Sequence, residues 1–145
     1  LPKLATANQP PEKARLVAGG GRPAKLPRGW FVQPTVFADV ENSDVIAREE
    51  IFGPVLSIIP FEDEAEALAI ANDSDYGLGG TVWSRDRERA TRLARQVKTG
   101  SIGINGYVLD INAPFGGVKA SGIGREMGPE SITGYQQYKS VYQMG

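Results

Sequence analysis

The stretch VLSIIPF, residues 55–61, is a near-continuous apolar run without alternating polar residues. Such a run is typical of a strand that is buried on both faces of a parallel sheet. Two further strands, GGTVWS (79–84) and SIGIN (101–105), follow at intervals that each leave room for a helix. The sequence therefore predicts an α/β fold.

Helical spacing fills both intervals between these strands. The residues at i, i+3, i+4 and i+7 are Ala65, Leu68, Ala69 and Asn72 in the first interval, and Ala90, Leu93, Ala94 and Val97 in the second. Acidic residues 62–64 and Asp86 stand near the helix starts, where the positive end of the helix dipole favours them. Strand, helix, strand, helix and strand predict two successive right-handed crossovers and one parallel sheet. Ligands of such sheets bind beyond the carboxyl ends of the strands, and the long glycine-rich loop 106–121 is one such place.

The N-terminal part reads as short strands rather than crossovers. Residues 1–14 contain three prolines and predict an irregular arm, with one short helix around residues 12–15. LVAGGGRP (16–23) predicts a strand that breaks into a turn. GWFVQPTVFADV (29–40) predicts an edge strand or a bulge, because Pro34 interrupts it.

The C-terminal part predicts a short helix and a last strand. The helix covers residues 129–137, and the strand is KSVYQM (139–144). A single strand at a chain end presents unpaired backbone groups, so we expect it to pair elsewhere, with another subunit as one possibility.

Composition excludes several kinds of protein. The 145 residues carry a net charge of −1, so no basic field is available for nucleic acid or an anionic membrane. No apolar run approaches the ~20 residues of a membrane span, and no signal segment opens the chain, so we expect a cytoplasmic protein. Cysteine and histidine are both absent, which excludes thiol catalysis, disulfides and the usual zinc sites within this chain. The chain begins at Leu1 rather than Met, so we expect a piece of a longer protein or a trimmed N-terminus.

Two acidic residues precede the first apolar run, in EEIFGPV (49–55). In one interpretation Glu49 and Glu50 close a short helical turn after Asp44 and are simply solvated. In the other, a carboxylate with two acceptor oxygens holds both hydroxyls of a ribose, and Phe52 offers an apolar face beside a flat ring. The residues alone leave both interpretations open. GIGREMG (122–128) has the wrong spacing for a dinucleotide fingerprint, and no strand directly precedes it.

Several long motifs in series decide the resemblance. In chain order these five motifs are GWFVQPTVF, EEIFGPV, ANDSDYGLGGTVWS, PFGGVKASGIGRE and GYQQYKSV. They resemble those of the NAD(P)-dependent aldehyde dehydrogenases in both order and spacing. About residues 15 to 144 resemble the C-terminal part of that family. The resemblance implies a Rossmann-like, parallel-sheet half of the catalytic domain (15–127) after the arm (1–14). It also implies a C-terminal helix and oligomerisation strand (128–145).

The resemblance implies roles for named residues. Glu50 would hydrogen-bond the nicotinamide ribose of NAD or NADP, and Phe52 would pack near the nicotinamide ring. The loop before PFGG would contribute Leu109, Asp110, Ile111 and Phe115 to the wall of the substrate tunnel. The carboxylate of Asp110 either faces water or favours a polar or cationic substrate. Arg125 and Glu126 resemble a structural pair near the subunit contact, to which we assign no chemistry.

The family oxidises an aldehyde to a carboxylic acid. A cysteine attacks the aldehyde, hydride passes to NAD(P)+, and water activated by a glutamate hydrolyses the thioester. Because this chain has no cysteine, we expect it to be inactive without the N-terminal half of the enzyme. A truncated, non-catalytic assembly or binding module of the same fold is the alternative. A homo-oligomer through the C-terminal strand is expected, with no nucleic acid and no membrane as partner.

Overall fold

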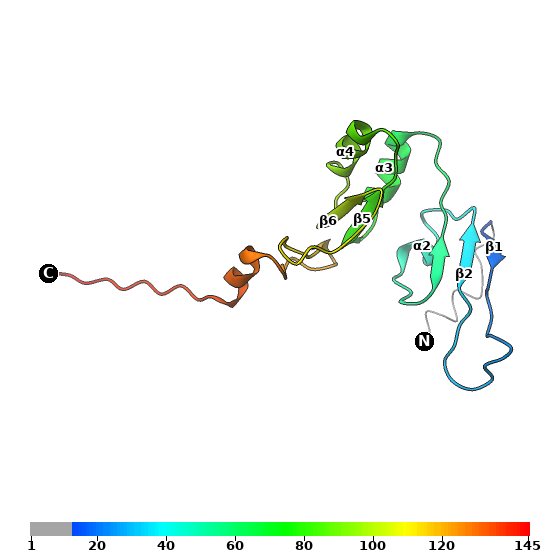
Figure 1. Ribbon diagram of the computed structural model, residues 1–145, viewed down its shortest axis with the longest axis horizontal. Coiled ribbons are helices and arrows are strands. Elements are labelled where there is room, and N and C mark those ends of the chain that lie inside the picture. Colours follow the sequence, from blue (N-terminus) through cyan, green and yellow to red (C-terminus); the bar gives the residue numbers. More distant parts are fainter. Residues whose placement is uncertain (1–12) are drawn as a thin grey trace. The chain divides into compact units, whose positions relative to one another are not determined.

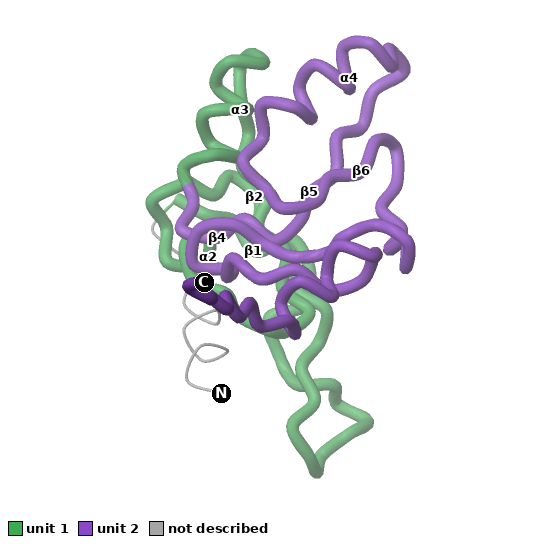
Figure 2. Tube along the Cα trace, turned by 90° about the vertical axis from the view of Figure 1, so that its left-hand side faces the viewer, with its two compact units in different colours: residues 1–73 green, residues 74–145 purple. Residues whose placement is uncertain are grey.

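The structure is a computed structural model that describes residues 13–145. The chain divides into two compact units, residues 1–73 and 74–145, shown in two colours in Figure 2. The expected arm lies outside the described residues except for Lys13 and Ala14, and Arg15 begins a strand rather than ending a helix.

The first unit is built on a three-stranded sheet (Figure 1). Its strands are β1 (Arg15–Ala18), β2 (Thr35–Ala38) and β3 (Val55–Ser57), in the order β1-β2-β3. β1 runs antiparallel to β2, and β3 runs parallel to it with Thr35 opposite Val55. The strand predicted after residue 15 is therefore present, and the edge strand predicted around Pro34 begins directly after that proline as the central strand β2.

The core of this unit lies against one face of the sheet. Phe37 is 1% exposed and Val40 2%, and both pack with Ile46 from the short helix α2 (Val45–Arg48). Burial alternates along β2, as expected when one face of a strand is covered. The core therefore covers only one face of the sheet, including one face of β3.

The prediction that residues 55–61 form a strand buried on both faces is wrong. β3 ends at Ser57, although Ile58 still donates a backbone hydrogen bond to Phe37 at 2.9 Å. Leu56 is 57% exposed and Ile58 46% exposed. β3 is an edge strand with an apolar core on one face only, so the side chains that point to the other face meet solvent.

The first predicted helix is confirmed as α3 (Glu64–Asn72). The carboxylate of Asp63 accepts a hydrogen bond from the Glu66 backbone N–H at 2.9 Å and so caps the helix start. At the other end, Asp73 receives the Arg48 guanidinium at 2.6 Å, which ties the end of α2 to the end of α3. No residue of α3 is buried.

The second unit contains the predicted strand–helix–strand crossover. β5 (Gly79–Val82) and β6 (Ser101–Ile104) pair in parallel, and α4 (Arg87–Ala94) connects them. Ala90 is fully buried and Ala94 nearly so, which confirms the face predicted by their spacing. The wider prediction of one parallel sheet from residues 55–61 through 101–105 stays a prediction, since β3 lies in the first unit, where it pairs with β2, and β5 and β6 lie in the second.

Close backbone contacts explain two glycines of this unit. A Cβ at Gly100 would lie 1.7 Å from the carbonyl oxygen of Gly116, and one at Gly103 would lie 1.8 Å from that of Gly106. The loop after β6 therefore runs directly against the start and end of that strand. Further along, β7 (Val118–Lys119) returns to pair antiparallel with β4 (Tyr76–Gly77).

The C-terminal region differs from its prediction. The predicted short helix is present as a 3-10 helix, η1 (Pro129–Tyr135), which ends two residues before residue 137. The hydroxyl of Thr133 donates to the carbonyl of Glu130 at 2.8 Å, within this tight turn. Residues 139–144 form no strand with any described residue, and they extend as a single segment in Figure 1. Within residues 13–145, no helix is long and apolar enough to cross a bilayer.

Candidate functional site

The two adjacent glutamates lie where α2 ends and the chain turns toward β3. Asp44 precedes the first residue of α2, and Glu49 is its C-cap, with extended backbone angles. Glu50 is the next residue, and the side chains of both glutamates are exposed. The short helical turn after Asp44, which the simpler interpretation required, is therefore present. Its presence does not conflict with the other interpretation, in which the Glu50 carboxylate holds a ribose.

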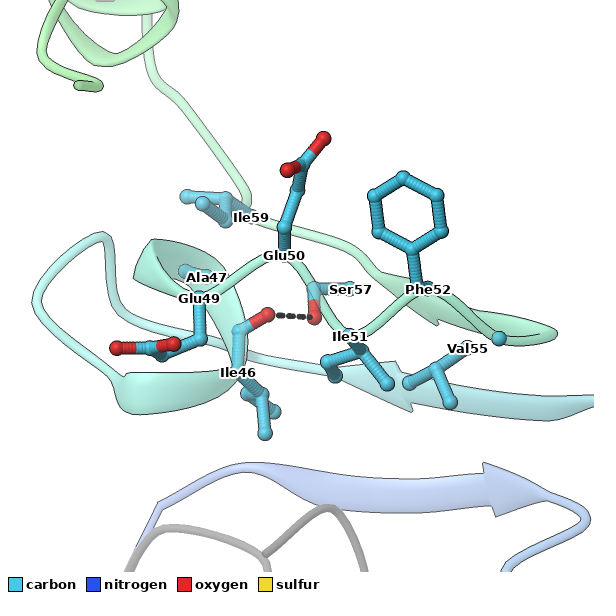
Figure 3. Close-up of a pocket in the computed structure, with 10 residues that line it drawn as sticks. Ile46, Ala47, Glu49, Glu50, Ile51, Phe52, Val55, Ser57 and Ile59 are labelled. Carbon is cyan, nitrogen blue, oxygen red and sulfur yellow. Dashed lines mark hydrogen bonds between the residues drawn. The ribbon is translucent and has the colours of Figure 1, made fainter. Parts of the chain in front are cut away.

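The side chains of Glu50 and Phe52 point to the same side of this segment, whereas Glu49 points away from them (Figure 3). Phe52 is 90% exposed. No hydrogen bond or ion pair joins the Glu50 carboxylate to another residue within 13–145. Its acceptor oxygens are thus available to a ligand that lies beside the Phe52 ring.

The backbone holds Phe52 in an unusual conformation. Its φ is 53°, in the left-handed region that side chains other than glycine rarely adopt. The following turn is anchored, because Gly53 accepts a hydrogen bond from the Val55 N–H at 2.8 Å and Pro54 accepts one from the Thr35 N–H at 2.8 Å. Strained backbone that the surrounding structure imposes is concentrated at functional sites.

An open hollow of about 460 Å³ adjoins these two side chains. It is lined by Ile46, Ala47, Glu49, Glu50, Ile51, Phe52, Gly53, Val55, Ser57 and Ile59. The Ser57 hydroxyl donates to the carbonyl oxygen of Ile46 at 3.1 Å (Figure 3), which joins α2 to β3 below Glu50. The lining is mixed, with the carboxylates of Glu49 and Glu50 among apolar side chains.

The four predicted tunnel residues lie in one loop of the second unit. Leu109, Asp110 and Ile111 are exposed, and Phe115 is half-buried. Phe115 and Glu126 exchange both backbone hydrogen bonds at 2.7 Å.

The Asp110 side chain stabilises a turn within this loop. Its Oδ1 accepts hydrogen bonds from the Asn112 backbone N–H at 2.9 Å and from the Asn112 side-chain amide at 3.1 Å. Its own carbonyl accepts a hydrogen bond from Ala113 at 3.0 Å. An aspartate that bonds the backbone two residues further on is a usual way to build a turn.

Arg125 does not form the expected pair with Glu126 among the described residues. Its guanidinium Nη1 donates to the carbonyl oxygens of Gly117 at 2.7 Å and Gly124 at 2.8 Å. Arg125 therefore closes the PFGG turn through backbone carbonyls, which a guanidinium with several N–H groups can bind at once.

Sequence reasoning missed the residues and contacts that support the segment from Glu49 to Phe52. This support includes the hydrogen bond from Ser57 to Ile46, the positive φ of Phe52 and the apolar side chains of Ile46 and Ile59. The serine inside VLSIIPF was a signal, because a polar residue in an apolar run needs a hydrogen-bond partner. Within residues 13–145, no group of three or more acidic, histidine or cysteine side chains could hold a metal ion.

Comparison with known proteins decides the family. Residues 5–141 match the aldehyde dehydrogenase family. The chain belongs to the aldehyde dehydrogenase family. It is 69% identical over 133 residues to a geranial dehydrogenase of Castellaniella defragrans, which covers 92% of this chain and 28% of that protein. It is 53% identical over 131 residues to a 3-succinoylsemialdehyde-pyridine dehydrogenase of a Pseudomonas species, which covers 90% and 28%.

Solved aldehyde dehydrogenase structures have the same fold over this region. An aldehyde dehydrogenase of Mycobacterium tuberculosis complexed with NAD+ superimposes with a TM-score of 0.84 at 58% identity, over 87% of this chain and 26% of that one. A betaine aldehyde dehydrogenase of Staphylococcus aureus in complex with NAD+ gives 0.82 at 44% identity, over 91% and 26%. The chain thus spans little more than a quarter of the length of the aldehyde dehydrogenases that it matches.

Proposed function

We propose that this chain is the C-terminal part of an NAD(P)-dependent aldehyde dehydrogenase, which oxidises an aldehyde to a carboxylic acid. Membership of the family and the NAD+ complexes of its solved relatives support this proposal. The observation that carries it is the pair of Glu50 and Phe52, which project together beside an open hollow of mixed polar and apolar lining.

Glu50 binds the ribose next to the nicotinamide. Its carboxylate has two acceptor oxygens, and a ribose diol has two hydroxyl donors. Hydrogen bonds to a carboxylate are short and strong, and the exposed position of Glu50 lets a ligand reach both oxygens. The residues present therefore fit the sugar of a dinucleotide.

Phe52 limits the position of the nicotinamide ring. An exposed aromatic ring beside an open hollow offers a flat face against which a second flat ring can pack. When bound, NAD(P)+ supplies the hydride acceptor of the reaction. Glu50 and Phe52 then hold the reacting end of the cofactor by its sugar and by its ring.

The loop with Leu109, Asp110, Ile111 and Phe115 forms part of the substrate tunnel. This assignment rests on the family resemblance of the loop before PFGG and on the exposure of its apolar side chains. Residues 139–144 pair with a partner subunit, since this extended segment forms no strand pairing with any residue of 13–145 and leaves its backbone groups open to a second strand.

The chain is not catalytically competent alone. The 145 residues contain no cysteine, so the thiol nucleophile comes from the N-terminal half of the enzyme. The purified chain should form no NAD(P)H from any aldehyde, and addition of the N-terminal half should restore turnover. Turnover by the chain alone would refute this part of the proposal.

Two glutamine variants test the site within the restored enzyme. Glu50→Gln should lower kcat/KM for NAD(P)+ by about 10- to 100-fold, because it weakens hydrogen bonds to a charged acceptor. Glu49→Gln is the matched control and should change it by less than about twofold, because its side chain points away from Phe52. Equal effects of the two variants would contradict the assignment, and a restored complex without turnover would favour a non-catalytic module.

A further inference from the structure

The loop that follows β6 contains a single charged residue. Between Ser101 and Val118, Asp110 is the one residue that carries a formal charge at pH 7. Its neighbours Val108, Leu109 and Ile111 are apolar and exposed, Val108 to 91% and Ile111 to 75%. The chemistry that this loop offers to a ligand therefore depends on what the Asp110 carboxylate does.

The polar groups of the loop bind one another. Asp110 Oδ1 takes two hydrogen bonds from Asn112, and the Asn112 amide is used in one of them. The phenol of Tyr107 lies 2.5 Å from the Ser101 hydroxyl, within hydrogen-bond distance. The two Asn112 bonds hold Oδ1 of the carboxylate against its own turn, and the apolar side chains of Val108, Leu109 and Ile111 are exposed beside it.

Backbone hydrogen bonds hold this surface in place. Ala113 donates to Asp110 at 3.0 Å, Gly128 donates to Ile111 at 3.0 Å, and Phe115 is paired with Glu126. The C-terminal end of the apolar stretch is thus attached to neighbouring chain. The carbonyl of Ile111 is fixed by its bond to Gly128, so the exposed side chain of Ile111 is a built feature of the loop.

We propose that this loop selects aldehydes whose non-reacting end is uncharged and apolar, and that it does not receive a cationic group. The inference rests on the proposed function, in which the loop lines the substrate tunnel. An alkyl or aryl tail gains free energy by covering Val108, Leu109 and Ile111, whereas a cationic tail loses its hydration against these apolar side chains, beside a carboxylate that Asn112 already holds in its own turn. Asp110 then serves the shape of the wall rather than the charge of the substrate.

Two isosteric aldehydes provide the direct test in the full-length enzyme. In 3,3-dimethylbutanal a neutral tert-butyl group occupies the space that a trimethylammonium group occupies in trimethylammonioacetaldehyde. We expect kcat/KM for the neutral aldehyde to be at least about tenfold higher, because a charge without a partner is costly to desolvate. Straight-chain aldehydes from propanal to hexanal should gain about two- to fourfold per methylene. Equal or better use of the cationic aldehyde would overturn the inference.

Variants separate the two roles of the loop residues. Asp110→Asn keeps the Oδ1 acceptor of the turn and removes the charge, so the ratio of neutral to cationic kcat/KM should stay within about twofold. A tenfold rise in that ratio would make Asp110 a cation receptor and would contradict the inference.

Ile111→Asp adds a carboxylate to the apolar surface and should lower the ratio by about tenfold or more. Ile123→Asp is the matched control, since Ile123 is equally apolar and 91% exposed but lies outside the loop. It should leave the ratio unchanged, and equal effects of the two substitutions would contradict the assignment. If no aldehyde of either class is oxidised, the proposed function itself fails, which differs from an active enzyme with the opposite preference.

Discussion

Phe52 shows how a single backbone angle determines what a ligand meets. Its φ of 53° turns the ring away from the apolar core of the first unit and leaves it 90% exposed. The turn that follows is anchored by hydrogen bonds to Gly53 and Pro54, so this conformation is imposed rather than local. The motif identifies the residue, but sequence patterns do not encode a positive φ at a phenylalanine, and the structure was needed to see it.

Substitution of Phe52 can separate backbone strain from ligand binding. Since the side chain is exposed, its loss removes little packing, and the backbone term dominates. Glycine accepts a positive φ freely, whereas a β-branched residue does not. Phe52→Gly should therefore be more stable than Phe52→Val by about 1–2 kcal/mol in urea unfolding. Equal unfolding midpoints would show that φ is not strained here.

Among the elements, the sequence predicted helices and strands correctly where the signal is local, but it did not predict burial that depends on distant parts of the chain. The crossover β5-α4-β6 was predicted because helix spacing and capping residues are encoded within a few residues. Burial of residues 55–61 was not, because it depends on what covers the second face of β3. The last helix was predicted at the right place, and the structure shows that it is a 3-10 helix.

Capping of α4 offers a test at this scale. The Asp86 carboxylate accepts a hydrogen bond from the Arg89 N–H at 3.0 Å and satisfies one of the free donors of the first turn. Asp86→Ala should lower the free energy of unfolding by about 1 kcal/mol, measured by urea titration followed by circular dichroism. Asp86→Asn retains an acceptor and should lose less than half of that amount. An alanine variant as stable as the parent chain would refute the capping role.

At the scale of the whole molecule, large apolar side chains are exposed in both units. They include Trp30 and Phe31 in the first unit, and Trp83, Ile123 and Tyr142 in the second. Exposed apolar surface and an unpaired extended segment are features that lead to association. We therefore expect the isolated chain to self-associate.

Sedimentation velocity at high micromolar concentration checks this expectation. The chain should form oligomers whose proportion rises with concentration. Tyr142→Pro removes a backbone N–H that a strand ladder needs, and it should weaken association more than Tyr142→Thr, which keeps that donor. A monodisperse monomer would contradict the expectation, and equal effects of the two variants would assign association to side chains alone.

The role of Glu50 is tested most directly by a crystal structure of the full-length enzyme with bound NAD(P)+. The account predicts that both carboxylate oxygens of Glu50 lie about 2.5–3.2 Å from the hydroxyls of the nicotinamide ribose, with the Phe52 ring beside the nicotinamide. A Glu50 side chain directed away from that sugar, with the ribose held by other residues, would contradict it.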